Sequence, residues 1–244
     1  MKKLGNILYV TTPEAYLSLD GENVVVKKED KPAMRLPLHN LENIVCFNYP
    51  GVSPALMGAC AERNIGLAFL QPGGRFLARV SGRVKGNVLL RKKQYELSWQ
   101  EDTRRSIAAG FLLGKIANSR KVIQRGVRDH TLLVDGPALR AVSASLKELL
   151  GAVQDAKSLD VLRGLEGSAA RLYFSVFGEL ILQQKEHFFF EERSRRPPLD
   201  NMNALLSFLY SLLSMEVASA LEAVGLDPYV GFLHADRPGR PSLA

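Results

Sequence analysis

Residues 81–93 read Ser81-Gly-Arg-Val-Lys-Gly-Asn-Val-Leu-Leu-Arg-Lys-Lys93, and this basic, glycine-containing stretch separates two parts of the chain with different patterns. Before it, short apolar runs alternate with turn residues, which is typical of β-strands. After it, apolar residues recur every three or four positions, which is typical of amphipathic helices. The sequence therefore predicts an α+β protein with a β-rich domain at residues 1–82, a basic linker at 83–96 and a larger α-helical domain at 97–244.

The N-terminal part contains short strand candidates and one short helix. Apolar or β-branched runs at 16–19 and 24–27 flank Asp20-Gly21, which supplies the turn of a hairpin. A helix over 55–63 is expected to begin at Ser53-Pro54, because serine caps a helix and proline fits its first position. The other strand candidates are residues 6–10, 31–37, 44–47, 67–70 and 75–80.

Four long helices are predicted after the linker, with expected bounds of 103–124, 137–153, 159–187 and 201–224. Asp200 suits the cap at the start of the last helix, and Gly225 suits its end. The second part of the chain should therefore be entirely helical.

The charge distribution points to a polyanionic partner. The chain has 244 residues and a formal net charge of +7. No acidic residue occurs between Glu62 and Glu96 or between Asp102 and Asp129, whereas these gaps hold eight and seven basic residues. Such runs favour contact with a phosphate backbone, and a solvated basic surface is the alternative.

The cysteines and the apolar runs indicate which kinds of site and segment the protein is expected to lack. Cys46 and Cys60 lack the spacing of a structural zinc site, so free thiols are expected. No apolar run predicts a signal peptide or a membrane span. We therefore expect a cytoplasmic protein that does not enter a membrane.

Glu166 stands at the head of an apolar stripe in the third predicted helix. Steps of three and four residues lead from it to Ala169 and Tyr173 and onward along the same face. An ionised carboxylate is costly to bury unless it is paired or binds a cation. The alternative is a partly exposed glutamate that the helix dipole favours near the start of the helix.

Several other polar residues are candidates for a site. On the fourth helix, Asn203 heads a second apolar stripe and could orient a loop or a ligand, or be a satisfied structural amide. His234 lies between an apolar run and a loop in which proline and glycine hold Arg237 and Arg240, as in a phosphate clamp. A second basic loop, with a solvated linker as the alternative, contains Arg193, Arg195 and Arg196.

Three segments together resemble a known family. They are Leu165-Glu-Gly-Ser-Ala-Ala-Arg-Leu-Tyr-Phe174, Arg196-Pro-Pro-Leu-Asp-Asn-Met-Asn-Ala-Leu-Leu-Ser-Phe-Leu-Tyr210 and Gly225-Leu-Asp-Pro-Tyr-Val-Gly-Phe-Leu-His234. In this order and spacing the chain resembles the CRISPR-associated spacer-acquisition integrase/endonuclease family over nearly its whole length. That resemblance implies a β-rich dimerisation domain followed by a helical catalytic domain.

The resemblance also implies a metal site. Glu166 and His234 match the family's catalytic metal ligands, and Asn203, Tyr173 and Tyr210 would support them. A third acidic ligand is expected beyond Ala244, because Asp236 does not match the family position. Oxygen ligands with one imidazole suit Mg²⁺ or Mn²⁺. The implied activity is metal-dependent DNA cleavage and strand joining that inserts new spacers into a CRISPR array.

The partners implied by the resemblance are double-stranded and branched DNA, a second copy of the chain and a small ferredoxin-like CRISPR-associated protein. DNA binding should weaken steeply with salt and depend little on base sequence. Two alternatives stay open: a non-enzymatic basic DNA-binding or scaffolding protein with an incomplete metal site, and an unrelated helical phosphodiesterase acting on a small substrate. The expected DNA contacts are Arg79, Arg83, Lys85, Arg193, Arg195, Arg196, Arg237 and Arg240.

Overall fold

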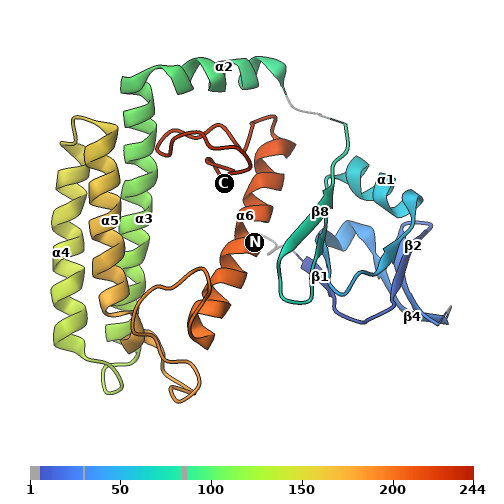
Figure 1. The fold of residues 1–244 in the computed structure, drawn as a ribbon, viewed down its shortest axis with the longest axis horizontal. Helices are drawn as coiled ribbons and strands as arrows, with labels where there is room; N and C mark the ends of the chain where they lie inside the picture. The colour runs from blue at the N-terminus through green and yellow to red at the C-terminus, as the bar shows by residue number, and fades with distance from the viewer. Residues whose placement is uncertain (1–5, 30, 84–86) are drawn as a thin grey trace. The chain divides into compact units, whose positions relative to one another are not determined.

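The computed structural model describes residues 6–29, 31–83 and 87–244. The chain divides into two compact units, one formed by residues 1–87 with 210–226 and the other by residues 88–209 with 227–244. All the strands lie in the first unit, and most of the helices lie in the second (Figure 1). The predicted α+β class is confirmed.

The first of two four-stranded sheets has the strand order β1-β5-β7-β8. β5 pairs in parallel with both β1 and β7, and β8 is antiparallel to β7. Parallel strands are usually covered on both faces, and Ile44, Val45 and Cys46 of β5 are accordingly all buried. The strands are β1 (Asn6–Val10), β5 (Leu41–Cys46), β7 (Gly66–Leu70) and β8 (Phe76–Val80).

The second sheet has the order β4-β3-β2-β6 and contains the predicted hairpin. β2 and β3 are antiparallel, with Asp20 paired to Asn23, so Gly21 and Glu22 form the connection. Gly21 has a φ of 55°, a left-handed conformation that glycine adopts without steric cost. The strands are β2 (Tyr16–Asp20), β3 (Asn23–Lys28), β4 (Lys31–Pro37) and β6 (Gly51–Val52).

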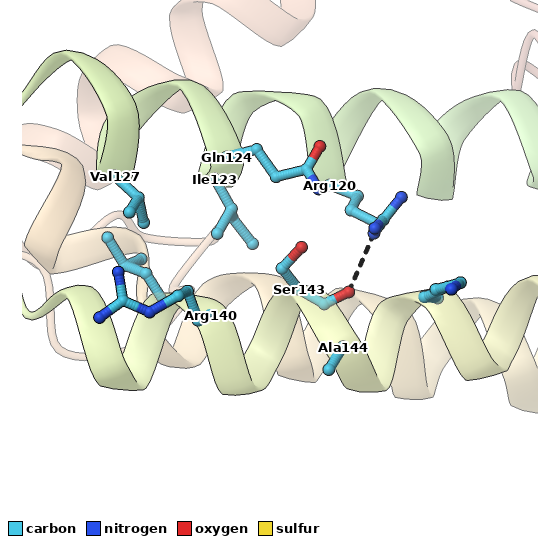
Figure 2. A pocket seen from close by; sticks show the side chains of 9 residues that line it. Arg120, Ile123, Gln124, Val127, Arg140, Ser143 and Ala144 are labelled. Atoms are coloured by element: carbon cyan, nitrogen blue, oxygen red, sulfur yellow. Dashed lines mark hydrogen bonds between the residues drawn. The ribbon is translucent and has the colours of Figure 1, made fainter.

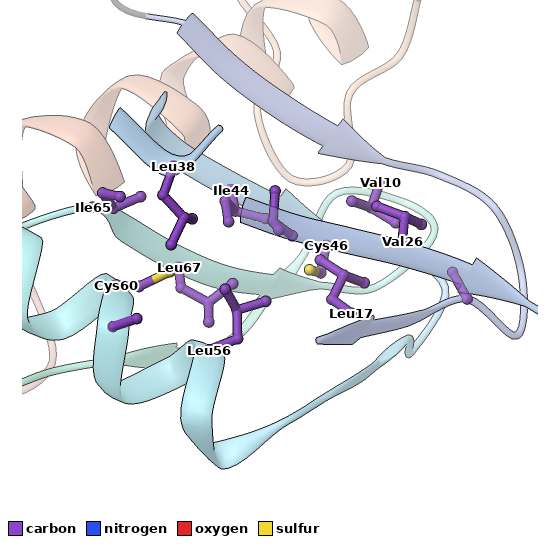
Figure 3. Packing of buried hydrophobic residues seen from close by; sticks show 13 residues of the cluster. Val10, Leu17, Val26, Leu38, Ile44, Cys46, Leu56, Cys60, Ile65 and Leu67 are labelled. Carbon is purple, nitrogen blue, oxygen red and sulfur yellow. The ribbon is translucent and has the colours of Figure 1, made fainter. Parts of the chain in front are cut away.

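Helix α1 (Pro54–Arg63) packs against both sheets and completes the core of the first unit. The Ser53 hydroxyl accepts a hydrogen bond from the backbone N–H of Leu56 at 3.2 Å, which confirms the predicted cap. Figure 3 shows Leu17, Ile44 and Leu56 pointing into one cluster, where each is fully buried. A short 3₁₀ turn, η1 (Leu38–Asn40), connects β4 to β5.

Both cysteines lie in this core. Burial raises the pKa of the Cys46 thiol to about 12, with a smaller contribution from Cys60, and burial raises the pKa of Cys60 to about 11. Because the thiolate is the reactive form, we expect neither thiol of the native protein to react with a chromogenic disulfide reagent at about pH 8. Both should react after denaturation. Rapid modification of either cysteine in the native protein, measured by mass spectrometry, would contradict the buried arrangement.

The second unit is built on three helices, α3 (Glu101–Asp129), α4 (Gly136–Gln154) and α5 (Leu159–Ser175), which pack against one another. Their contact buries Ile116, Ile123, Leu139, Leu146 and Leu162 almost completely. Hydroxyl and carboxylate caps begin two of them: the Ser158 Oγ accepts from the N–H of Val161, and the Asp135 Oδ1 accepts from that of Ala138. The remaining helices of the unit are α2 (Val88–Trp99), η2 (Phe177–Leu180) and the first part of α6 (Asn201–Ala223).

The predicted linker at 83–96 is wrong over much of its length. Residues 88–99 form α2, while residues 84–86 lie outside the described residues. Gln94 is only 3% exposed and hydrogen bonds with the backbone of residues 227 and 230. The partners that hold α2 lie far along the chain, so they leave no local pattern in its sequence. The basic, weakly amphipathic sequence of α2 was therefore interpreted as a linker.

The predicted third helix at 159–187 is too long. α5 ends at Ser175 and is followed by the short 3₁₀ helix η2. Phe174 and Phe177 both contact Phe190, with ring centroids 5.5 and 4.9 Å apart. The segment that contains Phe190 thus packs against the end of α5 and against η2. The apolar pattern continues past Ser175 because these residues pack in this cluster, and not because the helix continues.

Helix α6 begins and ends as predicted, with the Asp200 carboxylate accepting the N–H of Asn203 at 2.7 Å and Gly225 at positive φ after the end. Contrary to the prediction that no segment could span a membrane, α6 has the length and composition to do so, with a mean hydropathy of 1.6 over its most apolar window. A single helix of this kind is weak evidence, because core helices of soluble proteins pass the same test. Only 6% of that window is buried.

Candidate functional site

Glu166 lies on the inward face of α5. Leu162 and Ala169, one turn before and after it, are buried, so the periodicity of the helix turns Glu166 toward α3. Its carboxylate Oε1 accepts a hydrogen bond from the Nζ of Lys115 on α3 at 2.7 Å. The Glu166 side chain is 25% exposed. The predicted stripe is thus confirmed as far as the end of α5 at Ser175, and its head, Glu166, is paired with a more exposed Lys115.

The sequence analysis did not identify Lys115 as a residue of the site, although its position in the sequence indicates that it could be one. It stands beside Ile116 and three residues after Leu112, both of which are buried in the stripe of α3. A lysine at the edge of such a stripe is placed to reach an acidic group on the neighbouring helix. Only the packing of α3 on α5 identifies Glu166 as that group.

The surroundings of Glu166 keep its carboxylate ionised. Burial acts to raise its pKa, but the hydrogen bond and charge of Lys115, with the charges of His234 and Arg195, outweigh burial and lower the pKa below its usual value. Opposite charges within a few ångströms favour the charged form of a carboxylate, so Glu166 stays ionised although it is half-buried.

His234 is brought to this carboxylate by hydrogen bonds from α5 and α3 to the backbone just before it. The Nε of Arg163 donates to the carbonyl of Leu233 at 3.0 Å, and the Nε of Arg104 donates to that of Phe232 at 3.3 Å. Arg163 precedes Glu166 by one turn of α5, so anchoring Leu233 there delivers His234 beside Glu166. Each of these two side chains is near enough to act on the charge of the other.

The imidazole of His234 is kept neutral. Burial lowers its pKa, and the charge of Arg240 lowers it further, while Glu166 acts in the opposite direction without reversing the shift. Each of the two side chains thus affects the pKa of the other, which requires that they lie close together. A neutral imidazole beside an ionised carboxylate is the protonation state in which both groups bind a metal.

The C-terminal segment that carries His234 is also anchored to α2. The side-chain amide of Gln94 donates to the carbonyls of Asp227 and Val230 at 2.8 and 3.1 Å and accepts the N–H of Asp227 at 2.8 Å. The hydroxyl of Tyr95 donates to the Asp227 carboxylate at 2.8 Å. No motif in the sequence pointed to Gln94 or Tyr95, because their partners are backbone groups and a carboxylate about half the chain away.

Asn203 organises the arginine loop at 192–196. The side chain is fully buried, and its Nδ2 donates to the carbonyl of Glu192 at 2.8 Å. Its Oδ1 accepts from the Nη1 of Arg193 at 2.8 Å and from the N–H of Ser194 at 3.1 Å. Asn203 therefore shapes the loop from which Arg195 acts on Glu166, as a structural amide with a supporting role.

Two of the arginines expected to bind DNA are engaged in the fold instead. Arg79 forms an ion pair with Glu222 within the first unit and is 21% exposed. Arg193 is half-buried against Asn203 and Ser207. These contacts go against the prediction that both bind phosphate, because a guanidinium held by protein acceptors has fewer donors to offer. Arg83, Arg195, Arg196, Arg237 and Arg240 are exposed, so their DNA binding stays a prediction, and Lys85 lies outside the described residues.

The two tyrosines expected to support the site have different surroundings. Tyr173 packs in a cluster with Phe174 and Phe177, with ring centroids 5.5 and 5.8 Å apart. Tyr210 is 54% exposed and belongs to the unit that contains the sheets. Among the residues that the structure describes, no three histidine, cysteine, aspartate or glutamate side chains form a metal-binding group. Glu166 and His234 stay the two candidate ligands of the site.

Comparison with known proteins identifies a single family. The family model described as CRISPR associated protein Cas1 matches residues 8–244. A CRISPR-associated endonuclease Cas1 of Chlorobaculum tepidum is 47% identical over 244 residues, which cover all of this chain and 71% of that relative. One from Rhodospirillum rubrum is 50% identical over 252 residues, again with all of this chain and 71% of the relative covered.

Solved structures share the fold. A Cas1 protein from Thermotoga maritima is 24% identical with a TM-score of 0.74, and the match covers 97% of this chain and 72% of that one. A chain of a Cas6-RT-Cas1–Cas2 complex is 26% identical with a TM-score of 0.72, and the match covers 98% of this chain and 26% of that one. The family model spans nearly the whole sequence, and the two relatives are identical at about half of their positions. The chain belongs to the CRISPR-associated protein Cas1 family.

Proposed function

We propose that this protein is a divalent-metal-dependent DNA endonuclease and integrase of CRISPR adaptation. The observation that carries the proposal is the pairing of an ionised Glu166 with a neutral His234, close to the exposed arginines of two loops. The names of the relatives, which are CRISPR-associated endonucleases, support the nuclease activity.

Glu166 and His234 would hold the metal ion, which we propose to be Mg²⁺ or Mn²⁺. One carboxylate and one imidazole are few ligands, but Mg²⁺ commonly takes only one or two carboxylates and completes its shell with water and substrate phosphates. Bound there, such an ion would polarise a phosphodiester and stabilise the attacking or leaving oxygen.

The other residues of the site would position the DNA. Arg195 and Arg240 already act electrostatically on Glu166 and His234 and are exposed, so a phosphate at the metal site would lie near both guanidinium groups. Lys115, which now donates to Glu166, would be free to donate to a phosphate oxygen once the carboxylate binds a metal. Attack by water on the phosphorus would break one of its bonds to a sugar oxygen, which leaves as a hydroxyl, so the strand is cut. Attack by a 3′-hydroxyl in place of water would form a new phosphodiester while the same sugar oxygen leaves, so two strands are joined.

The proposed assembly is a homodimer formed through the β-rich domain and bridged by a small ferredoxin-like partner. A solved complex that contains Cas1 and Cas2 chains, one of which resembles this protein at 26% identity, supports such a partner. We also expect the protein to act in the cytoplasm, where a CRISPR array is located.

A cleavage assay tests the proposal. The full chain should nick branched duplex DNA with Mg²⁺ or Mn²⁺ and should do nothing in EDTA. Duplex affinity should fall at least about 100-fold between roughly 50 and 200 mM salt, because about four phosphate contacts would each release counterions. Cleavage that continues in EDTA would contradict the metal site, and salt-independent binding would contradict the phosphate contacts.

A second function is favoured by one observation, the lack of a three-ligand metal group within the described part of the chain. A non-enzymatic DNA-binding or scaffolding protein would need no such group. It would bind duplex DNA with the same salt dependence and would show no metal-dependent nicking.

A further inference from the structure

A groove of about 390 Å³ lies between α3 and α4, apart from the residues of the Glu166 and His234 site. Figure 2 shows Arg120 of α3 reaching toward the backbone of Ser143 on α4, and Gln124 of α3 and Arg140 of α4 also line the groove. We call it the α3–α4 groove. Its lining consists of Arg120, Ile123, Gln124, Val127, Leu139, Arg140, Ser143, Ala144 and Lys147.

The groove gathers positive charge with no negative charge to balance it. Arg120, Arg140 and Lys147 line it, and none of the lining residues is acidic. Nor does any of these three form an ion pair with a carboxylate in the described parts of the chain. The neighbouring bases Arg125 and Arg128, in contrast, both pair with Asp129. The three cations of the groove therefore attract an anion without first having to break a pair.

One of these cations is held in place. The Nε of Arg120 donates to the carbonyl of Ser143 at 3.1 Å, drawn as the dashed line in Figure 2. This bond uses one of the five donors of the guanidinium and leaves the rest of the fork available. A guanidinium fixed by the fold loses less conformational entropy when it binds a phosphate than a freely moving one.

The dimensions and the lining indicate a nucleic-acid backbone as the ligand. Arg140 and Lys147 are seven residues apart on α4, which is about 10 Å along the helix, so the two cations can contact different phosphates of one strand. Gln124 and Ser143 add neutral hydrogen-bonding groups of the kind that contact phosphates. No aromatic side chain lines the groove, so stacking on unpaired bases is not available.

We propose that the α3–α4 groove is a second nucleic-acid contact, which binds consecutive phosphates of a DNA duplex without reading its sequence. The identity of the ligand rests on the proposed function, whereas the anion-binding property rests on the groove itself. The groove shares no residue with the metal site, so it adds affinity and orients a longer duplex while leaving the chemistry to Glu166 and His234.

Charge reversal at the two exposed cations tests the proposal. The groove variant carries Arg140→Glu and Lys147→Glu, and Arg120 is kept because it bonds to the backbone. The control variant carries Lys121→Glu and Lys157→Glu, which change the net charge equally at two exposed lysines outside the groove. Duplex affinity is measured by fluorescence anisotropy in EDTA over a series of salt concentrations.

The groove variant should bind the duplex at least about tenfold more weakly than wild type, and its log–log salt slope should be smaller by about 2, because two phosphate contacts are lost. The control should lose less than about threefold. Equal losses in the two variants would overturn the proposal, as would an unchanged salt slope in the groove variant. If the reversed charges prevent folding, Arg140→Gln with Lys147→Gln should show the same ranking against Lys121→Gln with Lys157→Gln.

The result can be separated from that of the proposed function by assaying nicking in parallel. If wild type nicks DNA and the groove and control variants bind it equally well, only the proposal for the groove is overturned. A selective loss in the groove variant, with no metal-dependent nicking by wild type, would support the groove and overturn the endonuclease. A wild-type protein that binds no duplex would overturn both.

Discussion

Replacing Glu166 with glutamine should lower metal-dependent DNA cleavage by at least about 100-fold and leave duplex affinity nearly unchanged. Loss of even an outer-shell partner of a metal commonly costs 10- to 100-fold in activity, and Glu166 supplies the only carboxylate in the proposed donor set. Glutamine keeps the shape of the side chain but removes the charge that a metal requires. His234→Ala should behave in the same way, because it removes the neutral imidazole next to Glu166.

The same measurements on matched variants identify a loss that is specific to the site. Glu148→Gln changes an exposed glutamate on α4, and His39→Ala changes an exposed histidine in η1, so both should cleave like wild type. Cleavage is followed as single-turnover nicking over a range of Mn²⁺ concentrations. Full activity in Glu166→Gln would remove this carboxylate from the mechanism, and loss of activity in the controls would show that the effect is general.

Replacing Asn203 with leucine should destabilise the helical unit by about 3 kcal/mol or more. Leucine has nearly the same size but cannot hydrogen bond, so the carbonyl of Glu192, the N–H of Ser194 and the Asp200 carboxylate would each lose a partner around a fully buried side chain. Each buried group left without a partner costs about 1–3 kcal/mol. For a chain of this size the midpoint of thermal unfolding should fall by about 10 °C.

Asn201→Leu is the control for this prediction. Asn201 lies at the start of the same helix, but it is exposed and its side chain makes one hydrogen bond, to the carbonyl of His187 at 3.0 Å. Its loss should cost no more than about 1 kcal/mol. Hydrogen exchange at residues 192–196 should rise sharply only in Asn203→Leu, and equal stability of the two variants would show that the hydrogen bonds of Asn203 do not hold the loop.

The features predicted correctly from the sequence are those decided by residues close together in the chain. Ser53-Pro54 starts α1, Asp20-Gly21 turns the hairpin, and Asp200 caps α6. In each case the decisive contact joins residues within about four positions, so its energy is already present in the local sequence. The inward position of Glu166 follows equally from helical periodicity.

The features that required the tertiary structure are those whose partners lie far away in the chain. Helix α2 is held through Gln94 by backbone groups 133 and 136 residues later, and Glu166 is paired with Lys115, 51 residues earlier. Arg79, which was predicted to bind DNA, forms an ion pair with Glu222, 143 residues later in the chain. No local pattern specifies which distant group a charged or polar side chain meets, because that choice depends on how the helices and strands pack. The sequence by itself determined the secondary-structure framework and the two ligand candidates, and the packing decided which basic side chains are engaged in the fold and which stay exposed.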